Sequence, residues 1–416
     1  MTAVVNFLIL GTLVGNVLLA LFRPRQGVAA YLLLAFVAPH FHLGGTAISY
    51  EILGFLPVGG AAFYRNGFRF QLKAEHWLWI GYFVVAAAAT LLSVIRFGAG
   101  VRWIAMVGWG RAFFLFVLIS TVLNREGIFR VLSAAVVFNL VVAAAQLFIP
   151  GAIETTHTLY AKESQDVLAQ YLERGFIPRA PGTLGSPVNL GALALLTFAV
   201  AYERILRRGY SKQSAFIVLA SVIAGGLAIS KTAILGIPLI LALGLALRFG
   251  QKLVSGFRIV PRRLVRATTV VAAGGIGVWY MVRALSEAGF SILYYLGFIL
   301  NPLEAFETRY SGEGAVLNKT IEVTMENWLT GVGFTSPFGE FLGDSAYITA
   351  AHNSGISAVI IILLIYIITV CRNVSFKRKS MLLPLLALLM TGFALPTLFK
   401  VEGAILLSYA IYKGKK

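Results

Sequence analysis

Apolar runs of membrane-spanning length alternate with short polar segments along almost the whole chain. A transmembrane helix needs about 20 mostly apolar residues, and the pattern predicts roughly twelve of them. The expected ranges are 3–22, 27–43, 46–64, 77–95, 101–123, 128–150, 187–203, 213–229, 232–249, 264–284, 351–371 and 380–397, with a short further segment at 398–412. The predicted fold class is therefore an all-α integral membrane protein, organised as a single domain over 1–416.

Two long polar stretches, 151–186 and 283–350, interrupt this alternation. The second holds eight of the 17 acids, namely Glu287, Glu304, Glu307, Glu313, Glu322, Glu326, Glu340 and Asp344. Lipid offers no partners for backbone polar groups, so a polar insert between two spans must fold against the membrane face. Apolar residues recur at helical spacing between 317 and 328, which predicts a short surface helix. We expect this insert to be a lid that carries the chemistry.

Composition excludes an ordinary soluble enzyme. Hydrophobic residues make up 58% of the chain and charged residues 12%, whereas soluble domains have about 25% charged residues. The first run, 3–22, has no basic segment before it and no convincing cleavage site, so we expect a retained span and not a signal peptide. The single cysteine, Cys371, excludes disulfides within the chain.

The distribution of Lys and Arg predicts the orientation. Most of the 35 basic residues lie in the loops 23–26, 65–76, 124–130, 203–212, 248–266 and 372–379 and at the C-terminal end. Loops rich in Lys and Arg face the cytoplasm, which places 151–186 and 283–350 on the outer, periplasmic side. This bias also accounts for the net charge of +18 without a nucleic-acid partner.

The basic loops are too short for a catalytic domain, and the chain has no GxxxxGK[ST] phosphate-binding loop. Any chemistry should therefore take place on the outer face, where no nucleotide is available. A substrate there must arrive already activated.

Arg179 lies in the segment 177–191, which contains three prolines and three glycines. Ser186 is a suitable N-cap and Pro187 suits the first helical position. A helix start presents free N–H groups and a positive dipole end, so with Arg179 nearby it predicts an anion site. The alternative is an arginine that only anchors the chain at the membrane surface.

Two further cations lie in or between predicted spans. Lys231 begins a helix after a tight outer turn, where a cation is unfavourable unless an anion is bound; the alternative is a lysine that reaches to the membrane surface. Arg111 lies near the middle of 101–123, where a charge costs roughly 3 kcal/mol on insertion scales. Its partner must be a ligand or an acid from another helix, and both alternatives stay open.

Asp344 follows a glycine at the membrane face, directly before the span 351–371, and is a candidate general base. Its alternative is a helix N-cap. His352 comes eight residues later on the same helical face and is the second candidate base, or a hydrogen-bond donor to another helix. Asp344 has no DxD-type companion, so we expect no metal ion and no cofactor.

Read in order, these features resemble the O-antigen polymerase and ligase superfamily of membrane glycosyltransferases. The resemblance covers mainly residues 175–370. The matching parts are Arg179-Ala-Pro-Gly-Thr-Leu-Gly-Ser-Pro-Val-Asn-Leu-Gly191, the turn Ser230-Lys-Thr, the large outer loop with Arg309, Glu326-Asn-Trp-Leu-Thr-Gly-Val-Gly-Phe334 and Asp344-Ser-Ala-Tyr347.

The resemblance implies an O-antigen or exopolysaccharide polymerase in a bacterial inner membrane, with its active site facing the periplasm. Donor and acceptor would be glycans on a polyprenyl diphosphate, with membrane lipids and a chain-length regulator protein as partners. Clustered cations fit such a donor, because a diphosphate leaving group needs them to hold its developing charge. We assign this role to Arg179, Lys231, Arg309 and Arg111.

Two departures from the family pattern bear on the reaction. Lys231 stands where members often carry an arginine, and a lysine lacks bidentate geometry. Ligases usually carry a His-Asn pair where this chain has Asp344, which favours a polymerase; His352-Asn353 resembles that pair but comes some eight residues late. The alternatives are a ligase that transfers glycan to lipid A-core, and a transporter or flippase for an anionic lipid or solute. Arg111 supports transport, whereas the absence of an inverted repeat opposes it.

Overall fold

A computed structural model describes residues 2–43, 46–70, 72–160, 179–253, 307, 310, 317–340, 345–375 and 379–412. The regular secondary structure of this part of the chain is helical apart from one small hairpin. The α-helices are α1 Thr2–Phe22, α2 Pro24–Val37, α3 Tyr50–Arg65, α4 Ala74–Phe97, α5 Trp103–Val122, α6 Arg125–Phe148, α7 Ala152–Tyr160, α9 Pro187–Arg208, α10 Lys212–Leu227, α11 Lys231–Leu253, α15 Asn318–Glu326, α16 Ala346–Ser375, α17 Leu382–Ala394 and α18 Val401–Ile411. Two short 3-10 helices are η2 Lys379–Met381 and η3 Thr397–Phe399.

Seven of the described helices are long and apolar enough to cross a membrane: α1, α4, α5, α6, α9, α11 and α16. Shorter apolar helices are α10, α17 and α18. The protein is therefore a helical membrane protein. Every predicted span contains a helix except 264–284, which lies outside the described residues.

The predicted spans 27–43 and 46–64 extend too far towards each other, because the residues between α2 and α3 are not helical. α2 ends at Val37, and the strands β1 Phe41–Leu43 and β2 Thr46–Ile48 pair antiparallel before α3 begins. Pro39 explains the early end, because proline disfavours helical conformation in the residue before it. Hydropathy alone did not separate this apolar hairpin from the helices beside it.

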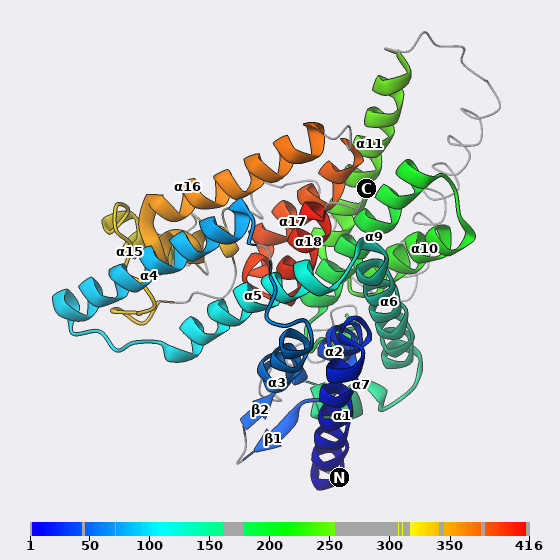
Figure 1. Ribbon diagram of the computed structural model, residues 1–416, viewed down its shortest axis with the longest axis horizontal. Helices are drawn as coiled ribbons and strands as arrows, with labels where there is room; N and C mark the ends of the chain where they lie inside the picture. The colour runs from blue at the N-terminus through cyan, green and yellow to red at the C-terminus, as the bar shows by residue number, and fades with distance from the viewer. Residues whose placement is uncertain are drawn as a thin grey trace.

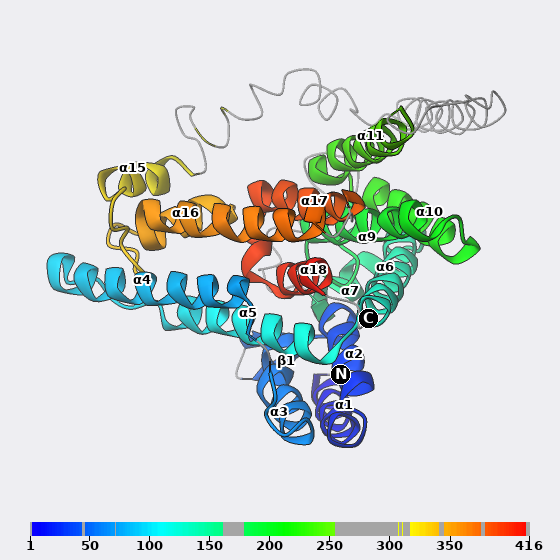
Figure 2. The same ribbon diagram turned by 45° about the horizontal axis from the view of Figure 1, so that its top comes forward.

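The helices form three groups (Figure 1). α4, α5 and α16 lie side by side and extend to one side of the molecule, with α15 over the end of α16. α1, α2 and α3 form a second group, and α6, α9, α10 and α11 a third. Figure 2 shows α17 between α16 and α9, and α17 contacts α16, α9 and α11. α17 therefore connects the first group with the third.

Polar contacts gather at opposite helix ends, and each contact joins ends that the charge distribution predicts to lie on one face. At the basic end, Arg372 pairs with Glu75 at 2.7 Å and Lys73 donates to the carbonyl of Ile411 at 2.9 Å. At the other end, the Thr183 hydroxyl donates to the carbonyl of Phe36 at 2.6 Å. Helix ends expected on one face thus contact each other.

α7 packs at this second end, where the predicted loop 151–186 begins. The Tyr160 hydroxyl donates to the carbonyl of Val37 at 3.3 Å. Burial raises the pKa of Tyr160, so its hydroxyl keeps its proton at neutral pH and serves as a structural donor.

We predict that Glu203→Ala destabilises the fold strongly. The Glu203 side chain is fully buried and accepts from Arg207 Nε at 2.8 Å, the Tyr409 hydroxyl at 2.6 Å and the Ser380 hydroxyl at 3.3 Å. Removing one partner of a buried ion pair costs about 3–5 kcal/mol. Thermal unfolding of the purified protein in detergent measures the effect.

Arg130→Ala is the control for this prediction. Arg130 is 74% exposed and pairs with Glu126 at 3.7 Å, and an exposed pair contributes less than about 1 kcal/mol. Equal losses of thermal stability in the two variants would contradict the assignment of Glu203 as a structural centre.

Candidate functional site

The long helix α16 is interrupted at Gly355, which has φ 59° and ψ −147° inside an otherwise helical run. Residues 328–335, named here the crossing segment, supply hydrogen bonds at this break. The Val332 N–H donates to the carbonyl of His352 at 2.8 Å, and the Gly333 N–H donates to the carbonyl of Asn353 at 3.1 Å. In return, the Ile356 N–H donates to the carbonyl of Trp328 at 2.7 Å.

Glycine is required where the crossing segment meets its neighbours. Gly331 and Gly333 have φ of 69° and 70°, a region that L side chains rarely adopt. A Cβ on Gly331 would lie 2.6 Å from the backbone N of Gly355, and a Cβ on Gly333 would lie 2.2 Å from the Thr90 backbone. The Gly-Val-Gly sequence therefore allows α16 and α4 to pack closely against the backbone of the crossing segment.

The other edge of the crossing segment is fixed to α4 and α5. The Phe334 N–H donates to Thr90 Oγ1 at 2.8 Å, and the Arg102 N–H donates to the carbonyl of Phe334 at 2.8 Å. The hydroxyls of Ser93 and Thr335 are 2.7 Å apart. Sequence reasoning placed a surface helix up to residue 328 and otherwise included residues 326–334 through a resemblance, whereas the structure shows that this segment joins α16 to two other helices.

His352 lies directly before this break and is fully buried. Its Nε2 faces Oε2 of the buried Glu340 at 4.0 Å, and its Nδ1 is 3.5 Å from Oδ1 of Asn353. Sequence reasoning named His352 but did not single out Glu340. An acid a few residues before a span that contains a histidine is the signal that was available.

Asp344 and Arg309 lie outside the described residues, so their roles stay predictions. Ser345, next to Asp344, is buried, and its hydroxyl donates to the carbonyl of Gly392 in α17 at 3.5 Å. The Tyr347 hydroxyl donates to the carbonyl of Leu389 at 2.8 Å. The start of α16 is thereby held against α17.

Arg179 and Lys231 belong to a second cluster, named here the outer corner: residues 179–191 and 227–231. Arg179 Nε donates to the carbonyl of Ala228 at 3.2 Å, and the Ala180 N–H donates to the carbonyl of Leu227 at 3.1 Å. A Cβ on Gly191 would lie 2.1 Å from the Ser230 Cβ. The structure thus brings together the first two segments on which the resemblance rests.

Two helices begin at the outer corner. Ser186 caps α9 as predicted, because its hydroxyl accepts from the Val188 N–H at 3.3 Å. Lys231 is the first residue of α11 and is exposed. Ile229, just before it, has φ 44°, a strained conformation for a β-branched residue, and such strain clusters at functional sites.

Arg111 has a partner on another helix. Its Nε lies 3.0 Å from Oε1 of Glu51 in α3. The buried Glu402 of α18 interacts electrostatically with both Arg111 and Glu51. Arg111 therefore forms an ion pair with another helix, which was one of its two expected roles. Its role in diphosphate binding stays a prediction. Sequence reasoning missed Glu51 and Glu402, although each is an acid within a predicted apolar segment.

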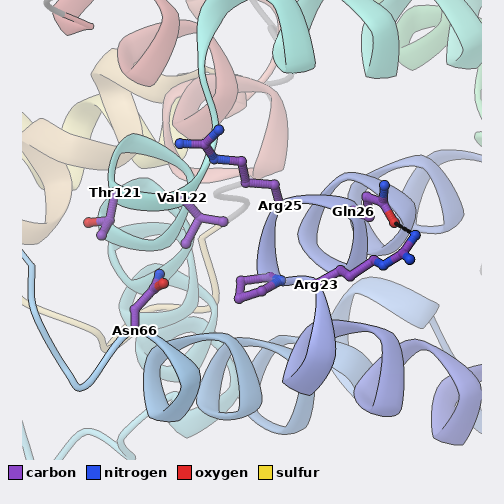
Figure 3. Close-up of a pocket in the computed structure, with 7 residues that line it drawn as sticks. Arg23, Arg25, Gln26, Asn66, Thr121 and Val122 are labelled. Carbon is purple, nitrogen blue, oxygen red and sulfur yellow. Dashed lines mark hydrogen bonds between the residues drawn. The ribbon is translucent and has the colours of Figure 1, made fainter. Parts of the chain in front are cut away.

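A pocket of about 360 Å³ lies at the opposite, basic end of the helices. Its lining residues are Arg23, Pro24, Arg25, Gln26, Asn66, Thr121 and Val122. In Figure 3, Arg25 extends above Val122, whereas Arg23 turns to Gln26, with Nη1 to Oε1 at 3.4 Å. α2 starts at this pocket and ends beside Thr183, so its length of about 20 Å separates the pocket from the outer corner.

No group of three His, Cys, Asp or Glu side chains within the described ranges is placed to hold a metal ion. The expectation that the protein uses no metal stays a prediction. In comparisons with known proteins, no family model matches the chain and no curated protein is significantly similar to it.

We predict that Gly333→Ala lowers thermal stability more than Gly339→Ala. Gly339 has a nearly identical φ of 68°, but a methyl group added there would meet no atom within 4 Å, whereas the same methyl on Gly333 would meet Thr90. Both variants carry the cost of a left-handed residue, about 1–2 kcal/mol, and only Gly333→Ala adds the clash. Equal melting temperatures would contradict the proposed fit between the crossing segment and α4.

Proposed function

We propose that the protein is a membrane glycosyltransferase that polymerises repeat units carried on a polyprenyl diphosphate. The observation that supports this proposal best is the outer corner. Arg179 and the Lys231 turn are about 50 residues apart in the sequence, yet Arg179 Nε bonds the turn directly. Two helix starts and two cations in one place suit a ligand with adjacent phosphate groups.

The reaction follows from the chemistry of such a donor. A hydroxyl oxygen of the acceptor glycan attacks the anomeric carbon of the donor, and the bond from that carbon to the diphosphate oxygen breaks. The diphosphate leaves with the bonding electron pair, which Arg179, Lys231 and Arg309 stabilise. The hydroxyl proton passes to Asp344. The reaction needs cations that stabilise the leaving diphosphate and a base that activates the acceptor hydroxyl. Without this help, neither the diphosphate nor the hydroxyl reacts readily.

The depth of the substrate in the membrane supports the choice of Asp344. A polyprenyl tail keeps the diphosphate near the membrane face, so the base must lie near a helix end and not at the tip of a loop. Asp344 directly precedes Ser345, which is held against α17. His352 is the second candidate, but its side chain is fully buried and its Nε2 faces Glu340.

The full proposal includes roughly twelve transmembrane helices, with 151–186 and 283–350 over one crevice on the periplasmic side of a bacterial inner membrane. The donor already carries its activation, so no cofactor is needed. A ligase remains the second candidate, favoured by the His352-Asn353 pair. Transport loses its main support, because Glu51 already provides the partner of Arg111.

We predict that Arg179→Ala reduces polymer formation at least tenfold. A charge-assisted contact to a phosphate contributes roughly 1.5–3 kcal/mol, which corresponds to that loss. Arg179→Lys should retain part of the activity, because it keeps the charge without the planar fork. Polymer length and amount on a gel, from cells that make the repeat unit, provide the measurement.

Arg69→Ala is the matched control, because Arg69 is exposed in a loop expected on the cytoplasmic face. It should leave polymer formation unchanged at equal expression. Full activity in Arg179→Ala would remove the outer corner as the diphosphate site.

We predict that Asp344→Asn reduces polymer formation by roughly 10²–10⁴-fold, the usual contribution of a general base. His352→Ala should have a smaller effect. Normal polymer from Asp344→Asn together with loss in His352→Ala would assign the base to His352 and favour the ligase. Normal polymer from both variants would mean that neither side chain is the base.

A further inference from the structure

The pocket at the basic end of the helices, named here the basic pocket, contains cations without acids. Its lining includes Arg23 and Arg25 and no Asp or Glu. Within the described part of the chain, the Arg25 side chain has no ion pair or hydrogen bond, and the Arg23 guanidinium contacts the neutral Gln26 at 3.4 Å. The pocket therefore has two positive charges and no described counter-charge.

The basic loops of the chain offer these two arginines no acid. The acids in those loops are Glu75, Glu126 and Glu203. Each of the three already forms an ion pair with another arginine: Glu75 with Arg372, Glu126 with Arg204 and Arg208, and Glu203 with Arg207. The charge of the basic pocket is therefore left for a ligand to balance.

The remaining lining adds neutral polar groups around a space of ligand size. In Figure 3, Asn66 points towards Thr121 and Val122, below Arg25. The volume of about 360 Å³ falls within the range of small-molecule sites, about 300–1,000 Å³. Guanidinium, amide and hydroxyl groups all donate to phosphate oxygens. The basic pocket therefore suits a phosphate group with a net negative charge.

An exposed apolar stripe of α1 ends at the basic pocket. Val14, Leu18 and Phe22 follow at intervals of four residues, which places them on one face of the helix. Each is exposed over at least half of its surface, and Phe22 directly precedes Arg23. Because α1 is long and apolar enough to cross a membrane, this stripe can contact acyl chains. A lipid along it would bring its headgroup to Arg23.

Charge distinguishes between the classes of lipid. A zwitterionic headgroup carries an ammonium group beside its phosphate, and the lining of the basic pocket has no acid to accept it. An anionic headgroup such as phosphoglycerol has the phosphate and hydroxyl groups without the cation. Basic pockets between transmembrane helices on the cytoplasmic side bind anionic headgroups, and the distribution of Lys and Arg predicts that this end faces the cytoplasm.

We propose that the basic pocket binds the headgroup of an anionic phospholipid, with an acyl chain along Val14, Leu18 and Phe22 of α1. Arg25, which extends above Val122 in Figure 3, and Arg23 hold the phosphate. Both arginines are exposed, and exposed side chains change rotamer within nanoseconds, so both can turn to the same phosphate. This binding site is separate from the outer corner and does not depend on the proposed transferase function.

The first test measures binding by thermal unfolding of the full-length protein in detergent, since a ligand of the folded state raises the melting temperature. The probes are phosphatidylglycerol and phosphatidylcholine with identical acyl chains, and glycerol 3-phosphate and inorganic phosphate as free anions. We expect phosphatidylglycerol to bind about tenfold or more tightly than any of the others. Arg25→Gln removes a charge-assisted contact and should weaken phosphatidylglycerol binding about tenfold.

Arg130→Gln is the matched control, because Arg130 is an exposed arginine of a basic loop that does not line the pocket. It should leave the affinity for phosphatidylglycerol unchanged. Equal affinities in Arg25→Gln and Arg130→Gln would overturn the site. Equal binding of phosphatidylcholine would overturn the selection for an anionic headgroup. Free anions that bind as tightly as phosphatidylglycerol would identify a soluble ligand and overturn the lipid.

The second test locates the acyl chain and needs only the wild-type protein. Phosphatidylglycerol with a photoreactive diazirine in its acyl chain is irradiated with the full-length protein, and the labelled peptides are identified by mass spectrometry. We expect the label to concentrate in residues 14–22 of α1 and to be displaced by unlabelled phosphatidylglycerol but not by phosphatidylcholine. Labelling spread evenly over the exposed helices would contradict the proposed position of the lipid, even if Arg25→Gln fails to fold.

Discussion

The interrupted helix α16 depends on one constraint: its freed backbone groups need partners at membrane depth. Water is not available there, so each unmade backbone bond is costly. The crossing segment supplies donors to the carbonyls of His352 and Asn353 and an acceptor for Ile356. The break at Gly355, the glycines of the crossing segment and the attachment to Thr90 therefore form one connected arrangement.

Buried charges order the remaining helices in a similar way. Arg111 pairs with Glu51, and Arg372 pairs with Glu75, and each of these ion pairs joins two different helices. A lone charge in an apolar surrounding is unfavourable, so these pairs restrict how the helices can pack. A spacing error between two helices would separate such partners, whereas apolar contacts alone would tolerate it.

Much of the fold was predictable because hydropathy and charge are local signals. The predicted span 187–203 matches the start of α9, and the Ser186 cap and the Lys231 turn are as expected. The break in α16 was not predictable, because hydropathy continues across Gly355. Likewise, no local pattern pairs Glu51 with Arg111. The apolar spacing between 317 and 328 predicted the short helix α15 but not its buried face, because Met325 is 66% exposed whereas Thr320 and Val323 are buried.

The candidate site follows the same division between local and long-range information. Each residue type came from a local argument, such as a cation at a helix start or an acid beside a span. Arg179 contacts the Lys231 turn, and Glu340 lies opposite His352, because the fold brings their segments together. Sequence spacing alone does not predict either contact. At the outer corner, the strained Ile229 backbone and the absent side chain of Gly191 let the turn before α11 press against α9. That close fit fixes the distance between two helix starts, which is the preorganisation that the proposed diphosphate site needs.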